Sequence, residues 1–173
     1  MMKPDGRFWR IVAALAFALL AALWLRPARA LEPGDPAPVL ELEGRPLPVR
    51  LAPVAGQWLY IDFWASWCTP CRRSFPWMNE MQARHGTRGL RIVAVNLDRE
   101  RRDAERFLAE LPAAFTIAFD AGGDSARRYG IKGMPSSVLV APDGRVVFVH
   151  AGFRDDQRAE LERRLLAALP PPP

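Results

Sequence analysis

The chain has 173 residues, half of them hydrophobic, which is enough for one globular domain with a buried core. Its formal net charge is +5, but the first 30 positions hold five basic residues and one acid; without them, the totals of 24 and 19 become 19 basic and 18 acidic residues. That balance excludes a strongly basic surface, so we expect no nucleic acid partner, and the two cysteines exclude a zinc site of four thiolates.

The first 30 residues have the pattern of a signal peptide. Basic residues up to Arg10 precede an apolar run over 11–25, and Ala28-Arg29-Ala30 offers small residues where a signal peptidase cuts. The apolar run has 15 residues, fewer than the roughly 20 of a membrane-spanning helix. We therefore expect cleavage after Ala30 and a soluble periplasmic protein, with membrane anchoring through residues 11–25 as the alternative.

Residues 31–169 are predicted to form one α/β domain that begins with short strands. The lead-in over 31–38 is rich in proline and therefore unsuited to a helix. Val39–Leu42 and Val49–Leu51 are short strand candidates on either side of a turn-like segment. Leu59–Trp64 is apolar except for one acid, which predicts a buried central strand.

The rest of the domain alternates between helices and strands. The turn Pro142-Asp143-Gly144 predicts a hairpin, and Pro170 to Pro173 are expected to form a disordered tail. Parallel strands joined by helices, with an antiparallel edge, predict a mixed sheet with helices on both faces. The expected helices are Cys68–His85, Arg102–Leu111, Ser125–Tyr129 and Asp155–Leu169, and the expected strands are Leu90–Leu97, Thr116–Phe119, Ser137–Val140 and Val146–His150.

Both cysteines lie in one Cys-x-x-Cys motif, directly after the predicted central strand. This position places Cys68 at a helix N-terminus, where unpaired backbone N–H groups and the helix dipole stabilise the thiolate that attacks disulfides. We expect Cys68 to be the partly exposed nucleophile. Cys71 lies one turn further, on the same face, and is expected to be the buried resolving thiol. Asp62, an acid on a buried strand, should have a raised pKa and accept the proton of Cys71.

Three other interpretations of the two cysteines remain open. A zinc site would need two more ligands, and the two histidines, His85 and His150, lie far apart in the sequence. A structural disulfide would close a very short loop and add little stability. A copper carrier would need a His or Met cluster beside the thiols, which the sequence lacks. We therefore expect dithiol–disulfide exchange, without a metal or another cofactor.

Three segments resemble the thioredoxin superfamily. Phe63–Cys71 resembles the active-site segment of thioredoxins, and Gly133–Ser136 resembles the loop that carries a cis-proline opposite it. The run Cys68–Asn79, followed by Ile92–Asn96, is similar to the TlpA-like exported thiol-disulfide oxidoreductases. The resemblance covers nearly the whole predicted domain and implies a thioredoxin-like fold with additional short N-terminal strands.

The resemblance also implies roles for residues around the cysteines. Pro135 is expected to be cis and, with Met134, to present backbone groups to an extended substrate segment. Trp67 is expected to contact the substrate. Thr69 and Pro70, between the cysteines, are expected to lie at the substrate and to tune the redox potential.

The sequence departs from the family pattern at two places. Thioredoxins carry a lysine near their buried aspartate, and the aligned position here is Ala94. Many exported relatives carry asparagine and glutamate at the positions that Asp62 and Ser74 occupy in this chain. The acid on the strand therefore takes the place of the acid on the helix.

The resemblance implies a reductase of disulfides in exported proteins, with a membrane thiol transporter as electron donor. Apocytochrome c before haem attachment and copper-site assembly proteins are the substrates that it suggests. A disulfide oxidase or isomerase is the nearest alternative, and the redox potential separates it from a reductase.

Overall fold

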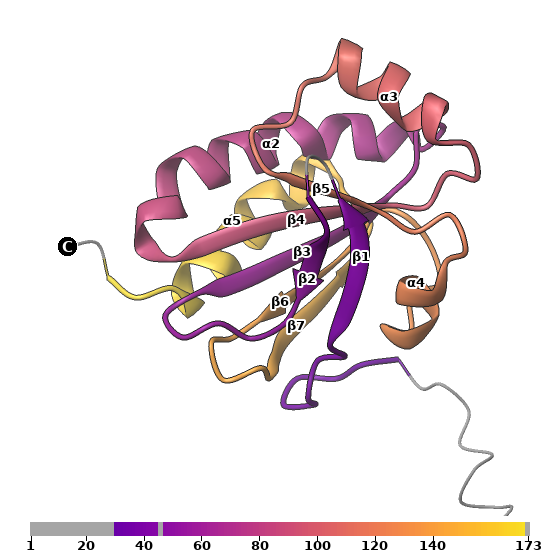
Figure 1. The fold of residues 1–173 in the computed structure, drawn as a ribbon. Coiled ribbons are helices and arrows are strands. Elements are labelled where there is room, and N and C mark those ends of the chain that lie inside the picture. Colours follow the sequence, from indigo (N-terminus) through magenta and orange to yellow (C-terminus); the bar gives the residue numbers. More distant parts are fainter. Residues whose placement is uncertain (1–29, 45–46, 172–173) are drawn as a thin grey trace, which may run out of the picture.

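Seven strands form one mixed sheet in the computed structural model, which describes residues 30–44 and 47–171. The strand order is β2-β1-β5-β4-β3-β6-β7 (Figure 1). The central strands β3, β4 and β5 are parallel, while β1, β2, β6 and β7 pair in antiparallel fashion. The strands are β1 Leu40–Gly44, β2 Val49–Leu51, β3 Trp58–Trp64, β4 Leu90–Asn96, β5 Thr116–Phe119, β6 Ser136–Val140 and β7 Val146–Ala151.

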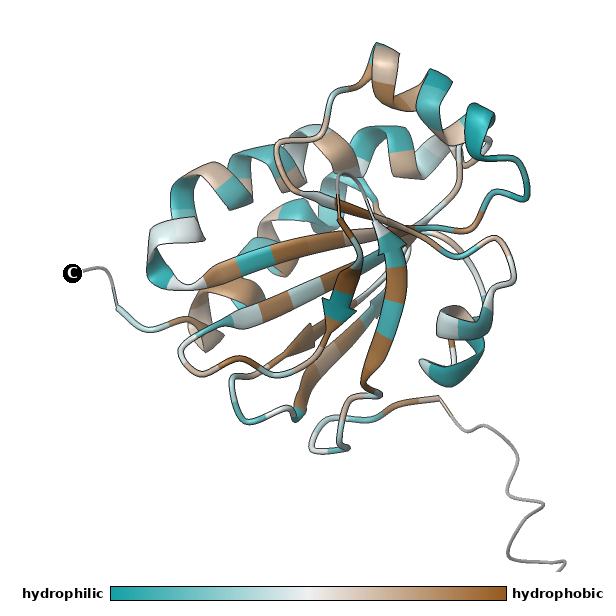
Figure 2. Ribbon diagram, viewed as in Figure 1, coloured by the Kyte–Doolittle hydropathy of each residue, from teal (hydrophilic) through white to brown (hydrophobic). Residues whose placement is uncertain are grey.

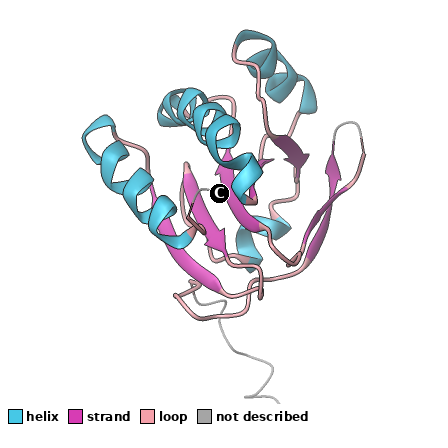
Figure 3. Ribbon diagram, turned by 90° about the vertical axis from the view of Figure 1, so that its left-hand side faces the viewer, coloured by secondary structure: helices cyan, strands magenta, loops and turns pink. Residues whose placement is uncertain are grey.

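Helices cover both faces of this sheet (Figure 3). Apolar residues of α2, α3 and α5 share one core cluster, whereas α4 contributes Ala126 to the cluster on the other face. The expected α/β architecture with a thioredoxin-like sheet is therefore confirmed. The helices are α2 Thr69–His85, α3 Arg101–Glu110, α4 Asp124–Arg128 and α5 Arg158–Ala168, with short 3-10 turns at η1 Gly86–Arg88 and η2 Asp155–Gln157.

The central strand β3 is buried on both faces, and its alternation decides where its one acid lies. Tyr60 and Trp64 belong to the core under α2, while Ile61 and Phe63 belong to the opposite core. Successive side chains of a strand point to opposite faces, so Asp62 lies on the face covered by α2. Figure 2 shows that much of the central strands is coloured as hydrophobic.

The Pro-rich lead-in extends the sheet edge beside β7. Pro36 forms an isolated antiparallel bridge with Arg145, and the N–H of Val146 donates to the carbonyl of Asp35 at 2.9 Å. The N–H of Gly34 in turn donates to the carbonyl of Val146 at 2.8 Å. These contacts cover backbone groups that an open edge strand would leave unpaired.

Most expected boundaries agree with the structure to within one or two residues, and the last helix differs most. Its first turn, Asp155–Gln157, is a 3-10 turn in which the N–H of Gln157 donates to the carbonyl of Arg154 at 3.0 Å. The α-helix begins only at Arg158.

Two expectations concern residues at the ends of the chain. The expected signal peptide covers residues 1–30, and its first 29 residues lie outside the described part of the chain. Residues 172–173 of the expected tail also lie outside it. Pro170 is described, and its carbonyl accepts a hydrogen bond from Nε of Arg88 at 2.9 Å. No helix in the described part of the chain has the length and apolar character needed to cross a membrane.

Candidate active site

The turn from β3 into α2 places the first cysteine at the start of the helix. Cys68 is the N-cap of α2, and its Sγ accepts the backbone N–H of Cys71 at 3.3 Å. A capping side chain accepts from the second or third N–H of the helix, and Pro70 at the second position has no N–H. The N–H of Cys71 is thus the donor that remains for the sulfur. A Cys68 thiolate would be stabilised by this donor and by the helix dipole.

The two cysteines form a disulfide with a Cα–Cα distance of 5.3 Å. Cys71 is fully buried, as expected, but Cys68 is only 4% exposed, less than we expect from the sequence. The reason is that its sulfur turns back toward the helix, where it is bonded to Cys71 and faces the N–H of that residue.

Asp62 is a buried acid on the face of the sheet that α2 covers. It is 3% exposed, and its Oδ2 has no hydrogen-bond partner. Burial raises the pKa of this carboxyl well above its usual range. On β4 its direct neighbour is Ala94, which offers no cation to offset that effect. The core cluster on this face includes Cys71, so the arrangement suits a carboxyl that takes a proton from the buried thiol.

Ser74 lies one turn after Cys71 in α2. It is buried, and its hydroxyl donates to the carbonyl of Cys71 at 3.0 Å. This bond stays within the first turns of α2. Ser74 therefore supports the helix at Cys71 but offers no acid to the disulfide.

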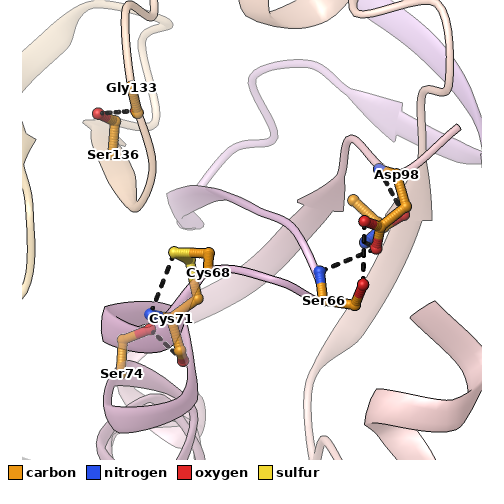
Figure 4. The surroundings of a disulfide bond; sticks show 8 residues. Ser66, Cys68, Cys71, Ser74, Asp98, Gly133 and Ser136 are labelled. Atoms are coloured by element: carbon orange, nitrogen blue, oxygen red, sulfur yellow. Dashed lines mark hydrogen bonds between the residues drawn. A yellow bond between two sulfur atoms is a disulfide. The ribbon is translucent and has the colours of Figure 1, made fainter. Parts of the chain in front are cut away.

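A second buried carboxylate, which the sequence analysis missed, holds the active-site turn (Figure 4). Asp98 follows β4, is 6% exposed, and accepts both the N–H of Ser66 at 2.9 Å and its hydroxyl at 3.1 Å. Nδ2 of Asn96 also donates to Asp98, at 2.8 Å, while the N–H of Asp98 donates back to Oδ1 of Asn96 at 3.1 Å. Asp98 therefore fixes the turn two residues before Cys68.

A pattern in the sequence points to the contact between Asp98 and Ser66. Asn96 and Asp98 follow the apolar part of one predicted strand, and Ser66 follows the neighbouring strand. Parallel neighbours end at the same edge of a sheet, so polar residues after both ends are expected to meet.

The cis-proline loop lies on the side of the disulfide away from Asp98 in the view of Figure 4. The Met134–Pro135 bond is cis, which confirms the expectation. The carbonyl of Pro135 accepts the N–H of Gly152 at 2.7 Å, and the hydroxyl of Ser136 donates to the carbonyl of Gly133 at 2.7 Å. Met134 is partly buried against the core under α2. The loop is thus held from both sides.

Trp67 is the most exposed aromatic side chain beside the disulfide, at 72%. It borders a hollow of about 210 Å³ that Arg72, Phe107 and Glu110 also line. The guanidinium of Arg72 is paired with Glu110 at 2.7 Å and lies over the ring of Phe107. The hollow therefore joins an aromatic surface to paired charges, features suited to contact with a polypeptide.

The other expected contact residues are accessible to different degrees. Thr69 is exposed and Pro70 half-buried at the start of α2, so both reach the surface next to Cys68. A second hollow, of about 330 Å³, lies along the cis-proline loop and is lined by Met134, Pro135 and Val149 among others. A hollow of about 460 Å³ lies elsewhere, at the amino ends of β4 and β5, far from the chemistry of the cysteines.

Histidines and metal ligands add little to this site. His85 lies at the end of α2, with Nδ1 3.2 Å from Nη1 of Arg88, and His150 lies on β7. Burial lowers the pKa of both rings. In residues 30–44 and 47–171, no three His, Cys, Asp or Glu side chains are grouped to hold a metal ion.

Known proteins similar to this chain are named as thiol-disulfide oxidoreductases, and one solved structure shares its fold. The family model described as Redoxin matches residues 32–165. The thiol-disulfide oxidoreductase ResA of Bacillus anthracis is 31% identical over 168 residues, covering 92% of this chain and 95% of the relative. ResA of Halalkalibacterium halodurans is 30% identical, covering 92% and 94%. The crystal structure of a candidate thiol:disulfide interchange protein DsbE from Chlorobium tepidum is 50% identical, has a TM-score of 0.78, and covers 80% of this chain and 99% of that one.

Proposed function

The chain belongs to the Redoxin family as a thiol-disulfide oxidoreductase of the TlpA/ResA-like type, and from this premise we propose that it reduces disulfides in extracytoplasmic proteins. Its reactive groups are Cys68, Cys71 and Asp62. Two electrons pass from the dithiol to the substrate, and the two cysteines become joined by the Cys68–Cys71 disulfide.

The first step is attack on the substrate disulfide. The Cys68 thiolate, held at the N-terminus of α2, forms a mixed disulfide and releases one substrate thiolate, which takes up a proton. Trp67, Thr69 and Pro70 border the reacting sulfur, and the backbone of Met134 lies on the other side, since the carbonyl of Pro135 already accepts the N–H of Gly152. A substrate segment that pairs with the cis-proline loop would hold its sulfur in line for the attack.

The second step releases the substrate. Cys71 gives its proton to Asp62, and the resulting thiolate attacks the sulfur of Cys68. The bond between Cys68 and the substrate breaks, the second substrate thiolate leaves, and the Cys68–Cys71 disulfide forms. Cys71 is fully buried, so its proton needs an acceptor inside the protein.

The observation that carries the proposal is Asp62, a buried carboxylate without a partner for Oδ2 on the face that holds Cys71. An unpaired buried carboxyl is costly, and a structural role would have given it partners. A proton acceptor for the resolving thiol accounts for that cost.

The leader pattern and the family resemblance support the proposed substrate and electron source. The leader pattern in the first 30 residues supports export to the periplasm, with residues 11–25 as an anchor if the leader is retained. Outside the cytoplasm the dithiol needs a supply of electrons, for which a membrane thiol transporter is the proposed donor. The proposed substrates are exported proteins that carry disulfides, including apocytochrome c before haem attachment.

The equilibrium redox potential of the Cys68–Cys71 pair tests the direction of electron flow. The protein is equilibrated with dithiothreitol or glutathione buffers, and the dithiol fraction is counted by alkylation and mass spectrometry. A reductase should lie near the value of thioredoxin, about −270 mV. A value near that of a strong oxidant, about −120 mV, would identify a disulfide oxidase and contradict the proposal.

Export is tested separately by expressing the full chain in a bacterium and fractionating the cells. Intact mass measurement of the periplasmic protein should give a chain that begins at Leu31. Recovery of the full-length chain from the membrane would support the anchor, and recovery from the cytoplasm would contradict export.

A further inference from the structure

A buried serine lies directly across the sheet from Asp62. Asp62 of β3 pairs with Ser137 of the antiparallel strand β6, and Ser137 is 2% exposed. Residues that face each other across an antiparallel pair lie on one face of the sheet, with Cβ atoms about 4.5–5.5 Å apart. The hydroxyl of Ser137 therefore shares the space under α2 with the carboxyl of Asp62.

Tyr60 fixes the hydroxyl of this serine. It lies two residues before Asp62, on the same face of β3, and its OH donates to Oγ of Ser137 at 2.8 Å. A serine hydroxyl accepts two hydrogen bonds and donates one. Because Tyr60 occupies one acceptor position, the hydrogen of Ser137 is free to donate to another group.

Tyr60 keeps its proton, so its role as donor does not change with pH. Burial, followed by the charge of Asp62, raises the pKa of Tyr60 far above the physiological range, and the hydrogen bond with Ser137 offsets this in part.

Besides Ser137, Asp62 shares this face of the sheet with two buried donors that have no hydrogen-bond partner, Nε1 of Trp64 and Nε1 of Trp77. From β4 its neighbour is the apolar Ala94, and from α2 the titratable group on this face is Cys71. On β7, His150 lies opposite Ser137, one strand further from Asp62, and burial and then the charge of Arg164 on α5 lower its pKa. No hydrogen bond satisfies Oδ2 of Asp62 in the disulfide form.

We propose that Ser137, oriented by Tyr60, is a positioning residue that donates a hydrogen bond to the Asp62 carboxylate when this group is ionised. The inference rests on the proposed role of Asp62 as proton acceptor. The bond stabilises the ionised form and therefore lowers the pKa of the carboxyl. More of the carboxyl is then ionised and able to accept the proton of Cys71.

A hydroxyl suits both protonation states of the acid. When Asp62 is ionised, Ser137 donates to it; when the proton of Cys71 has arrived, the O–H of Asp62 donates to the second acceptor position of Ser137. One proton moves, from Sγ of Cys71 to the carboxyl of Asp62, and the hydroxyl only rotates. A lysine or arginine in this place would hold the carboxylate ionised and unable to keep the proton.

The test is an infrared titration of Asp62 in the reduced full-length protein, with the carboxyl band assigned by its loss in Asp62→Asn. Ser137→Ala should raise the midpoint by about one pH unit or more, the usual worth of a hydrogen bond to a charged group. Tyr60→Phe should raise it by less, because Ser137 keeps its hydroxyl but loses its orientation. Ser137→Thr keeps the hydroxyl and should keep the midpoint.

Ser125→Ala is the matched control. Ser125 is a buried serine of α4 that bonds to Asp120, so its loss should lower stability without moving the Asp62 midpoint. Equal midpoints in the parent, Ser137→Ala and Tyr60→Phe overturn the inference and leave the proposed function intact. If Asp62→Asn reduces substrate disulfides at the parent rate at every pH, the role of Asp62 as proton acceptor fails, whereas the midpoints still decide whether Ser137 stabilises its carboxylate.

Discussion

Two buried carboxylates near the disulfide have opposite surroundings. Asp98 receives hydrogen bonds from the N–H and hydroxyl of Ser66 and from Asn96, whereas Oδ2 of Asp62 receives none. Both are at most 6% exposed. The first carboxylate is fully engaged in holding the turn before Cys68, and the second remains available to bind a proton.

One site thus contains two residues of the same type with different roles: Asp98 holds the turn, and Asp62 is available to bind a proton. A carboxylate that accepts several hydrogen bonds holds its donors in place, and its removal leaves those donors unpaired. A carboxylate without them is costly to ionise and readily protonated. Changes at each acid should therefore have opposite effects on stability.

The largest expected change in stability is that of Asp98→Ala. It leaves the part-buried N–H of Ser66 and the buried Nδ2 of Asn96 without an acceptor, so we expect a loss of about 2–4 kcal/mol in the free energy of unfolding. Urea denaturation of the oxidised protein measures this loss. A change below about 0.5 kcal/mol, typical of an inert surface site, would show that the turn does not depend on Asp98.

Asp120 supplies the control for this variant. Asp120 lies in the turn before α4 and accepts the N–H and hydroxyl of Ser125 in that helix, the same pattern as Asp98 with Ser66. Asp120→Ala should also lower stability, but it should leave the reduction rate per folded molecule unchanged, whereas Asp98→Ala should lower that rate because it releases the turn that carries Trp67 and Cys68.

The second prediction concerns the pH dependence of stability. Burial raises the pKa of Asp62 in the folded protein, so above the ordinary pKa of aspartate the unfolded chain has lost this proton while the folded protein still holds it. In that window stability falls as pH rises, by up to about 1.4 kcal/mol per pH unit, until the pH passes the raised folded pKa. Asp62→Asn should remove this slope and be more stable than the parent at neutral pH.

Urea titrations of the parent and of Asp62→Asn between about pH 4 and pH 8 measure the slope. This range extends from the ordinary pKa of aspartate to well above it. The difference between the two proteins cancels the contribution of the other titrating groups. Parallel curves, with Asp62→Asn less stable at each pH, would mean that Asp62 is a satisfied structural acid like Asp98.

The smallest expected effect is that of Ser66→Ala. This change removes one of the hydrogen bonds to Asp98, at 3.1 Å, and keeps the backbone bond at 2.9 Å. We expect a loss of about 1 kcal/mol in the free energy of unfolding, clearly less than for Asp98→Ala. A loss as large as that of Asp98→Ala would show that the turn depends on the hydroxyl of Ser66 and not on its backbone N–H.

The sequence predicted the parts of this site that depend on local order along the chain. Cys68 at a helix start, Cys71 one turn later and Asp62 on the preceding strand follow from spacing and burial, and cis Pro135 follows from a resemblance. The thioredoxin-like sheet follows from the alternation of strands and helices.

The exact contacts between distant segments could not be predicted, although the polar residues after two neighbouring strands indicate that Asp98 and Ser66 lie at the same edge of the sheet. Asp98 meets Ser66 over 32 positions and Tyr60 meets Ser137 over 77, and such pairs depend on the register between strands. A shift of one residue would turn each side chain to the other face, and the sequence pattern does not fix the register to that accuracy. The low exposure of Cys68 likewise depends on where its sulfur turns, which spacing alone does not give.

The most direct test of the account is the rate at which Cys71 resolves a mixed disulfide between Cys68 and a substrate peptide, followed by rapid mixing across the pH range. The account predicts that Asp62→Asn slows this step roughly 10²-fold at neutral pH, the low end for loss of a proton acceptor, and that the difference disappears at high pH, where the thiol ionises without help. Equal rates for the two proteins at every pH would contradict the account, because Asp62 would then take no part in the step.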